Sequence, residues 1–253
     1  MARAIPRLGL LAALPVVSTT AQALPMSYAG STTAGMTVDP HWSSAWVTRA
    51  MDPRHGLGAS LQVIPGTGGG HGETSSPASH RNQGDESFLL LDGTHLLKRW
   101  NRPSSQANLW LFTGVGLYRA SGSASDQTSG GHHHNHDLTG AQAITTPAAL
   151  RIAARPGLQV DMESTRLRVE GRGEWFVAPG VQRPLLSATA GAALSGPTYT
   201  GIQPWLELQV RAMPGVVNTL ELIPKLRLLH QRVVLEIGYS SLGSAMGGLT
   251  YTF

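Results

Sequence analysis

Hydrophobic and polar residues alternate one by one along most of the chain after residue 24. The clearest stretch runs from Arg166 to Phe176, where Leu167, Val169 and Trp175 alternate with charged residues. Successive side chains of a β-strand point to opposite faces, so this period predicts a strand with one charged and one apolar face. Similar alternation recurs at 57–63, 108–118, 206–211, 220–228 and 233–239. Helical periodicity is almost absent, and we therefore expect an all-β fold.

Clusters of turn-forming residues divide the chain into twelve expected strands. Their spans are 30–39, 42–51, 55–64, 87–101, 106–119, 142–159, 166–177, 184–194, 202–212, 216–229, 231–240 and 245–253. Ten or fourteen strands are the alternatives. The stretch 142–165 is open, because it holds either one long strand interrupted at Pro147 and Pro156 or two short strands.

The last five residues carry a more specific pattern. Leu249, Tyr251 and Phe253 place apolar or aromatic groups at the fifth-last, third-last and last positions. This ending resembles the C-terminal signal of bacterial outer-membrane β-barrel proteins, which the barrel-assembly machinery recognises. The resemblance implies a transmembrane, antiparallel up-and-down β-barrel surrounded by outer-membrane lipid, with Phe253 as the contact for the assembly machinery. A soluble exported β-protein that ends in Phe is the alternative.

The lengths of the connections agree with such a barrel. An even number of strands puts both termini in the periplasm, where barrel turns are short. The connections expected on that side are the short ones at 52–54, 102–105, 162–165, 195–201 and near 230. The two long connections, 65–86 and 120–141, fall on the opposite side, and we expect them to be external loops.

The N-terminal segment is typical of a secretory signal peptide. Arg3 and Arg7 flank the start of an apolar stretch at 8–17, and residues 21–23 supply small residues for cleavage. We expect residues 1–23 to be removed and residues 24–253 to form the barrel domain. Removal lowers the formal net charge of +4 by two. The remaining basic residues form no clustered face in the sequence, so we expect no nucleic-acid partner.

Histidine is concentrated in the two long connections. The chain has no cysteine, so a Cys-ligated metal site is excluded. Neutral imidazole, however, binds Zn²⁺, Cu²⁺ and Ni²⁺, and short His-rich tracts indicate metal binding. The candidate ligands are His71, His80, His132, His133, His134, His136 and Asp137. A solvated loop of low complexity without a metal is the alternative.

The charged face of each strand would line the lumen of a membrane barrel. The candidate lumen residues are Arg166, Arg168, Glu170, Arg172, Glu174, Glu207 and Arg211. We expect them to form a charge network with partners among Glu221, Lys225, Arg227 and Glu236. The same residues could instead line a small pore. We also expect all six tryptophans to lie in the aromatic girdles at the headgroup level.

Three functions follow as hypotheses. The first is a non-enzymatic outer-membrane barrel whose external His-rich loops bind Zn, Cu or Ni ions, for metal uptake or tolerance. The second is a passive channel for small solutes or ions. The third is a lipid-acting outer-membrane enzyme, although the chain has no Gly-x-Ser-x-Gly elbow and no other catalytic motif.

Overall fold

The computed structural model describes residues 29–66, 84–121, 149–196 and 201–253. Within these residues, no helix is long and apolar enough to cross a membrane. The strand segments are β1 (Thr32–Val38), β2 (Ser43–Ala50), β3 (His55–Ile64), β4 (Glu86–Arg102), β5 (Ser105–Ala120), β6 (Arg151–Ala154), β7 (Gly157–Ser164), β8 (Leu167–Ala178), β9 (Val181–Ala193), β10 (Gln203–Met213), β11 (Val217–His230), β12 (Val233–Tyr239) and β13 (Ala245–Thr252).

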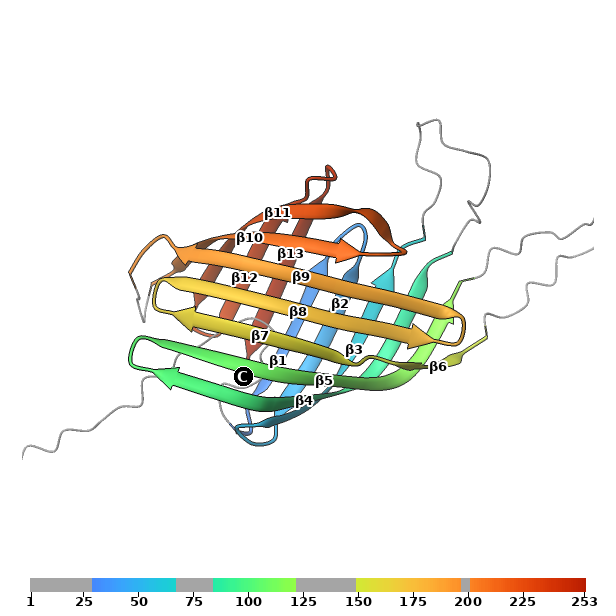
Figure 1. The fold of residues 1–253 in the computed structure, drawn as a ribbon, viewed down its shortest axis with the longest axis horizontal. Helices are drawn as coiled ribbons and strands as arrows, with labels where there is room; N and C mark the ends of the chain where they lie inside the picture. The colour runs from blue at the N-terminus through green and yellow to red at the C-terminus, as the bar shows by residue number, and fades with distance from the viewer. Residues whose placement is uncertain (1–28, 67–83, 122–148, 197–200) are drawn as a thin grey trace, which may run out of the picture.

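These segments form one closed antiparallel barrel (Figure 1). Strands that follow one another in the chain are paired, and β1 closes the barrel by pairing with β13, from Thr33 opposite Thr252 to Val38 opposite Gly247. Segments β6 and β7 share one position, because both lie between β5 and β8. The barrel therefore has twelve strand positions, which confirms the expected all-β, up-and-down architecture.

The strand expected at 142–159 differs from the observed one. Its position is filled by β6 and β7, which are separated by Arg155 and Pro156. Pro156 has no N–H to contribute to the ladder, and proline is found in sheets at such interruptions. The backbone N–H of Arg155 still donates to Gly114 O at 2.8 Å, and Pro156 O accepts from the N–H of Trp175 at 2.9 Å. Strand β7 ends at Ser164, so the turn between β7 and β8 consists of residues 165–166.

The two faces of the barrel have the polarity of a membrane barrel. Large apolar side chains point outward and are exposed, with Leu91 at 69% and Val115 at 62%. Charged side chains point inward and are buried, with Glu207 at 2% and Glu221 at 0%. A soluble sheet would place the charges in water and the apolar face in the core. This barrel does the reverse, as outer-membrane barrels do.

The two ends of the barrel differ in their connections. One end, called the terminal end below, carries the short connections 51–54, 103–104, 165–166 and 231–232 and the 194–202 connection. The first residue of β1 and the last residue of β13 also lie there. The opposite end, called the loop end, carries both long connections, 65–85 and 121–150. Both long connections therefore lie at the end expected for them, together with the short connections 39–42, 179–180, 214–216 and 240–244.

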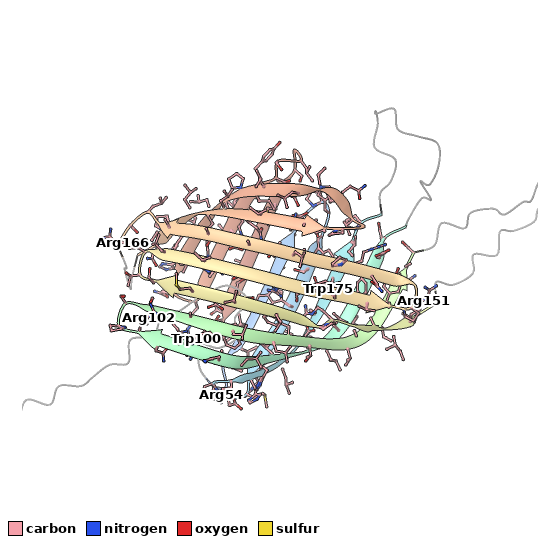
Figure 2. All side chains as sticks on the ribbon, in the orientation of Figure 1. Arg54, Trp100, Arg102, Arg151, Arg166 and Trp175 are labelled. Carbon is pink, nitrogen blue, oxygen red and sulfur yellow. The ribbon has the colours of Figure 1, made fainter. Side chains whose placement is uncertain are left out.

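The expectation that all six tryptophans lie in the girdles is wrong. Only Trp100 and Trp175 are exposed on the outer surface, at 42% and 46%, and Figure 2 shows them toward opposite ends of the barrel. The other four face the interior: three lie on inward-facing strand positions, where the two-residue period fixes the face of each side chain, and Trp42 lies in the connection between β1 and β2. They are Trp42, Trp46, Trp110 and Trp205.

Candidate functional site in the barrel interior

The interior holds most of the charged residues that the sequence assigns to the lumen. Six of the seven candidates point inward from β8 and β10: Arg168, Glu170, Arg172, Glu174, Glu207 and Arg211. Arg166 is the exception. It lies in the turn before β8 and is exposed, because the strand begins one residue later and its alternation does not extend to the turn.

Glu207 is the centre of an ion-pair network on one wall of the barrel. Its Oε1 atom lies 3.1 Å from Nη1 of both Arg168 and Arg227, and its Oε2 atom lies 3.6 Å from Lys225 Nζ. Arg168 also contacts Glu170 on the same strand. These residues come from β8, β10 and β11. Strands β10 and β11 are adjacent, whereas β9 lies between β8 and β10, so the network joins strands of one wall through their side chains.

A second network lies around Arg155, in the interruption between β6 and β7. Arg155 Nη2 is 2.9 Å from Asp92 Oδ1, and its Nη1 is 3.5 Å from Glu174 Oε1. Arg172 contacts the same Glu174 oxygen at 3.0 Å and lies 4.8 Å from the ring centre of Phe112. Each cation is thus matched by a carboxylate, which offsets the cost of removing these charges from bulk water.

Two further ion pairs span the interior. Arg183 on β9 contacts Glu86 on β4 at 2.6 Å, close to the loop end. Arg211 on β10 contacts Asp39, which follows β1, and also Glu221, both at 2.7 Å. In Figure 1, the strands β7–β9 cross in front of β1–β3, so the barrel has two facing walls. The Glu86–Arg183 and Asp39–Arg211 pairs tie segments that are not neighbours in the sheet. Glu221 and Arg211, by contrast, are cross-strand partners on the adjacent strands β11 and β10.

An apolar cluster lies in the barrel interior toward the loop end. Phe88 and Phe176 are fully buried, and their ring centres are 5.4 Å apart. Trp42 lies 4.7 Å from Phe176, and Tyr118 lies 4.9 Å from Phe88. We call these four residues the aromatic cap. Further buried members of the same cluster are Ile64, Leu90, Ala153, Ala178 and Met213.

A polar cavity of about 180 Å³ lies next to the aromatic cap. Trp42 belongs to both, and Gln62, whose Oε1 accepts a 2.8 Å hydrogen bond from Trp42 Nε1, lines the cavity. One side of the cavity carries paired charges, namely Asp92, Arg155, Glu170, Arg172, Glu174, Arg211, Lys225 and Glu236. The other side carries small hydroxyl side chains, among them Thr48, Ser60 and Thr250. A cavity of this size and polarity has room for several water molecules.

The candidate metal ligands lie outside the described residues. His71 and His80 belong to the segment 67–83, and the ligands between His132 and Asp137 belong to the segment 122–148. Among the residues that the structure does describe, no group of three or more His, Asp or Glu side chains could hold a metal ion. Metal binding by these loops therefore stays a prediction.

Sequence reasoning missed several interior residues. Asp92 lies on β4, whose alternation is obscured by a register shift between Leu96 and Lys98. Arg155 was hidden by the interruption of its strand at Pro156. The sequence did carry a signal for the aromatic cap, because Phe88 and Tyr118 fall on the inward-facing positions of the alternation in β4 and β5.

Comparisons with known proteins find matches among solved structures, whereas no protein-family model and no curated protein sequence matches the chain. Among solved structures, the chain is similar to a KdgM porin in complex with disordered oligogalacturonate, with 10% identity, a TM-score of 0.45, and coverage of 88% of this chain and 99% of that chain. It is also similar to a loop-deletion mutant of OmpT, an outer membrane protein of Vibrio cholerae, with 8% identity, a TM-score of 0.33, and coverage of 88% and 97%. The structure itself shows a closed antiparallel barrel with an apolar outer face and a charged interior, which is the architecture and polarity of a transmembrane β-barrel.

Proposed function

We propose that this barrel is a narrow channel for small polar solutes or ions, closed in the described conformation by the aromatic cap. The observation that carries the proposal is the polar cavity, which lies inside the membrane-spanning barrel and directly next to the cap. Ionisable residues inside a membrane protein are costly and commonly mark a solute or ion pathway.

The aromatic cap has the properties of a hydrophobic gate. Apolar constrictions stop conduction by excluding water, even where the adjoining pore is polar. The Glu86–Arg183 pair lies at the same end as the cap and joins two opposite strands, so it favours the closed arrangement. On the polar side, the charges are balanced pair by pair, which favours small neutral or zwitterionic solutes over ions of one sign.

Conductance in planar bilayers tests this function. The wild-type protein is expected to give rare, small current steps, because the cap closes the pathway most of the time. The Phe176→Ala variant removes a fully buried ring of the cap and is expected to give larger and more frequent steps. Leu89→Ala is the matched control, because Leu89 points outward from the strand that carries Phe88. Absence of steps from both the wild type and Phe176→Ala would refute the proposal.

A metal-collecting role of the His-rich loops is the second candidate. The described ends of the two long connections favour it, because they leave the loop end from the consecutive strand positions β3, β4, β5 and β6. Glu86 and Ala120, which begin β4 and end β5, are direct cross-strand partners. Two segments tethered so closely together can supply imidazoles to one ion at the mouth of the barrel.

Isothermal titration of the refolded protein with Zn²⁺, Cu²⁺ and Ni²⁺ tests the second candidate. The comparison is a variant in which His132, His133, His134 and His136 are replaced by Ala. Binding by the wild type above that of the variant supports metal collection. Equal heats for both proteins would exclude it and leave the channel proposal intact.

A further inference from the structure

Exposed basic residues encircle much of the terminal end of the barrel. They are Arg49, Arg54, Lys98, Arg102, Arg166 and Arg232, and we call them the basic collar. Figure 2 shows Arg166 and Arg102 at the left edge and Arg54 at the lower edge of the barrel, with Arg151 at the opposite side. Within the described part of the chain, none of the six side chains has an ion pair with a carboxylate.

A single acidic side chain, Asp52, lies among the described short turns at this end. Its carboxylate accepts hydrogen bonds from the backbone N–H of Arg54 at 2.6 Å and from His55 Nδ1 at 2.8 Å. The backbone N–H of Arg54, followed by the His55 side chain, lowers the pKa of Asp52 below its ordinary value of 3.8. Asp52 is thus engaged within its own turn, and the collar keeps a large excess of positive charge.

One part of the collar lies on the outer face of the β4–β5 hairpin. Lys98, Trp100 and Arg102 alternate along β4 and point outward, opposite Leu109, Ala107 and Ser105 of β5. The Lys98 ammonium lies 5.1 Å from the centre of the Trp100 ring. Tryptophan at the edge of an apolar belt marks the headgroup level of a membrane. These cations therefore lie at the depth of lipid phosphates.

A second part of the collar, formed by Arg49 and Arg232, lies on either side of the aromatic pair Tyr251 and Phe253. Arg49 is the cross-strand partner of Thr32, whose carbonyl accepts a 2.8 Å hydrogen bond from the Phe253 N–H. On the other side, the carbonyl of Arg232 accepts a hydrogen bond from the N–H of Thr252 at 3.0 Å. The Tyr251 and Phe253 rings pack 4.9 Å apart and are both exposed. Here too, exposed aromatic rings and arginines share the same level of the barrel.

The described residues at the loop end are different. Arg183 is paired with Glu86, and Arg151 donates a hydrogen bond to Pro179 O at 2.9 Å. Arg119 and Arg151 are the exposed basic residues there, apart from those in the two long connections. The collar is therefore a feature of one end and not a general property of the barrel surface.

We propose that the basic collar binds the phosphate groups of anionic phospholipids in the leaflet at the terminal end. Guanidinium and ammonium groups donate charge-assisted hydrogen bonds to phosphate oxygens. Each basic residue near an anionic lipid surface strengthens binding roughly fivefold. The collar places such residues beside Trp100, Tyr251 and Phe253, which hold this end of the barrel at the headgroup level. This lipid selectivity is independent of whether the barrel conducts.

Quenching of Trp100 fluorescence by brominated lipids tests the proposal in reconstituted vesicles. On a Trp175→Phe background, Trp100 is the outward-facing, exposed tryptophan of the described chain. Quenching by brominated phosphatidylglycerol in phosphatidylcholine vesicles is compared with quenching by brominated phosphatidylcholine in phosphatidylglycerol vesicles. We expect phosphatidylglycerol to be favoured severalfold, and the preference to weaken at about 1 M salt because the interaction is screened.

Two double variants test whether the lipid preference comes from the collar or from basic residues anywhere on the barrel surface. Lys98→Gln/Arg102→Gln is expected to bring the quenching by the two lipids close to equal, because each cation contributes up to roughly fivefold. Arg119→Gln/Arg151→Gln, at the loop end, is expected to leave it unchanged. If the first variant does not fold, Arg166→Gln, which lies in a turn, takes its place.

Three results would overturn the proposal. The first is equal quenching of wild-type Trp100 by the two lipids, and the second is an undiminished preference in the collar variant. The third is loss of the preference when chloride is replaced by inorganic phosphate at constant ionic strength, because it would show that the collar binds phosphate in general and not a lipid surface. Retention of the preference in phosphate supports the proposal.

Discussion

Replacing Glu207 by Gln tests whether the charged interior is a dry core or a wet pore. Glu207 has no exposed side-chain surface, and three cations lie within 3.1–3.6 Å of its carboxylate. Gln preserves the shape of the side chain and removes only the charge. Arg168, Lys225 and Arg227 then keep Glu170 and Glu236 as their counter-charges, so one positive charge in this network is left without a matching carboxylate.

The expected cost depends on how much water reaches the network. Removal of one partner from a buried ion pair destabilises a protein by about 3–5 kcal/mol, because the remaining charge is uncompensated. An ion pair exposed to water contributes less than about 1 kcal/mol. The burial of Glu207 places it in the first class, and we expect Glu207→Gln to lower the free energy of unfolding by about 3–5 kcal/mol.

Urea unfolding of the barrel in vesicles, followed by tryptophan fluorescence, measures this free energy. Glu221→Gln is the control, because Arg211 keeps Asp39 at 2.7 Å after the change, and its loss should be smaller. Glu207→Gln/Lys225→Met removes the excess charge and should recover part of the stability. If Glu207→Gln unfolds within about 1 kcal/mol of the wild type, water solvates the cations, and the classification of these contacts as buried ion pairs is wrong.

Three further predictions concern other parts of the barrel. A Cβ at Gly35 would lie 2.5 Å from the Trp46 ring, so Gly35→Val should cost about 1–3 kcal/mol in the same unfolding assay; no loss would contradict this close contact. Leu91→Arg places a charge on the apolar outer face and should cost about 2–4 kcal/mol in vesicles, whereas a neutral effect would argue against contact with lipid. Folding lowers the pKa of Asp52, so its ionised carboxylate stabilises the barrel at pH values above the ordinary pKa of 3.8. This contribution is lost as the pH falls through the lowered pKa. Asp52→Asn should therefore unfold with a weaker acid dependence below pH 4 than the wild type, and identical pH profiles would refute this.

Much of the architecture could be predicted because a barrel repeats one local rule. The two-residue period assigns each side chain to the lipid or to the lumen, so strand positions and the inward charges of β8 followed from residues close together in the chain. The rule fails where the strand ends or breaks. Arg166 lies just outside β8 and is exposed, and Arg155 points inward from an interruption that carries no alternation.

The interior partners could not be predicted, because they depend on how far each strand is shifted against the next. Glu86 and Arg183 are 97 residues apart in the chain, and Asp39 and Arg211 are 172 apart. Each pair meets only after the barrel closes with its particular stagger. The same holds for the aromatic cap, whose four rings come from β4, β5, β8 and the connection after β1. The number of tryptophans likewise does not tell the exposed Trp100 and Trp175 from the inward-facing ones, because the two groups differ only in the face of the barrel wall on which they lie.

The arrangement of the ion pairs constrains how such a channel could open. The Glu207 network lies within the β8–β11 wall, so it can stay intact while the pathway changes its width. The Glu86–Arg183 pair joins opposite strands at the level of the cap, and a wider opening there must break it or lengthen it. Because separating a buried pair costs several kcal/mol, the closed conformation is the stable one. Opening should therefore occur by rearrangement of the cap and this pair, while the charged wall below serves as the fixed lining of the pathway.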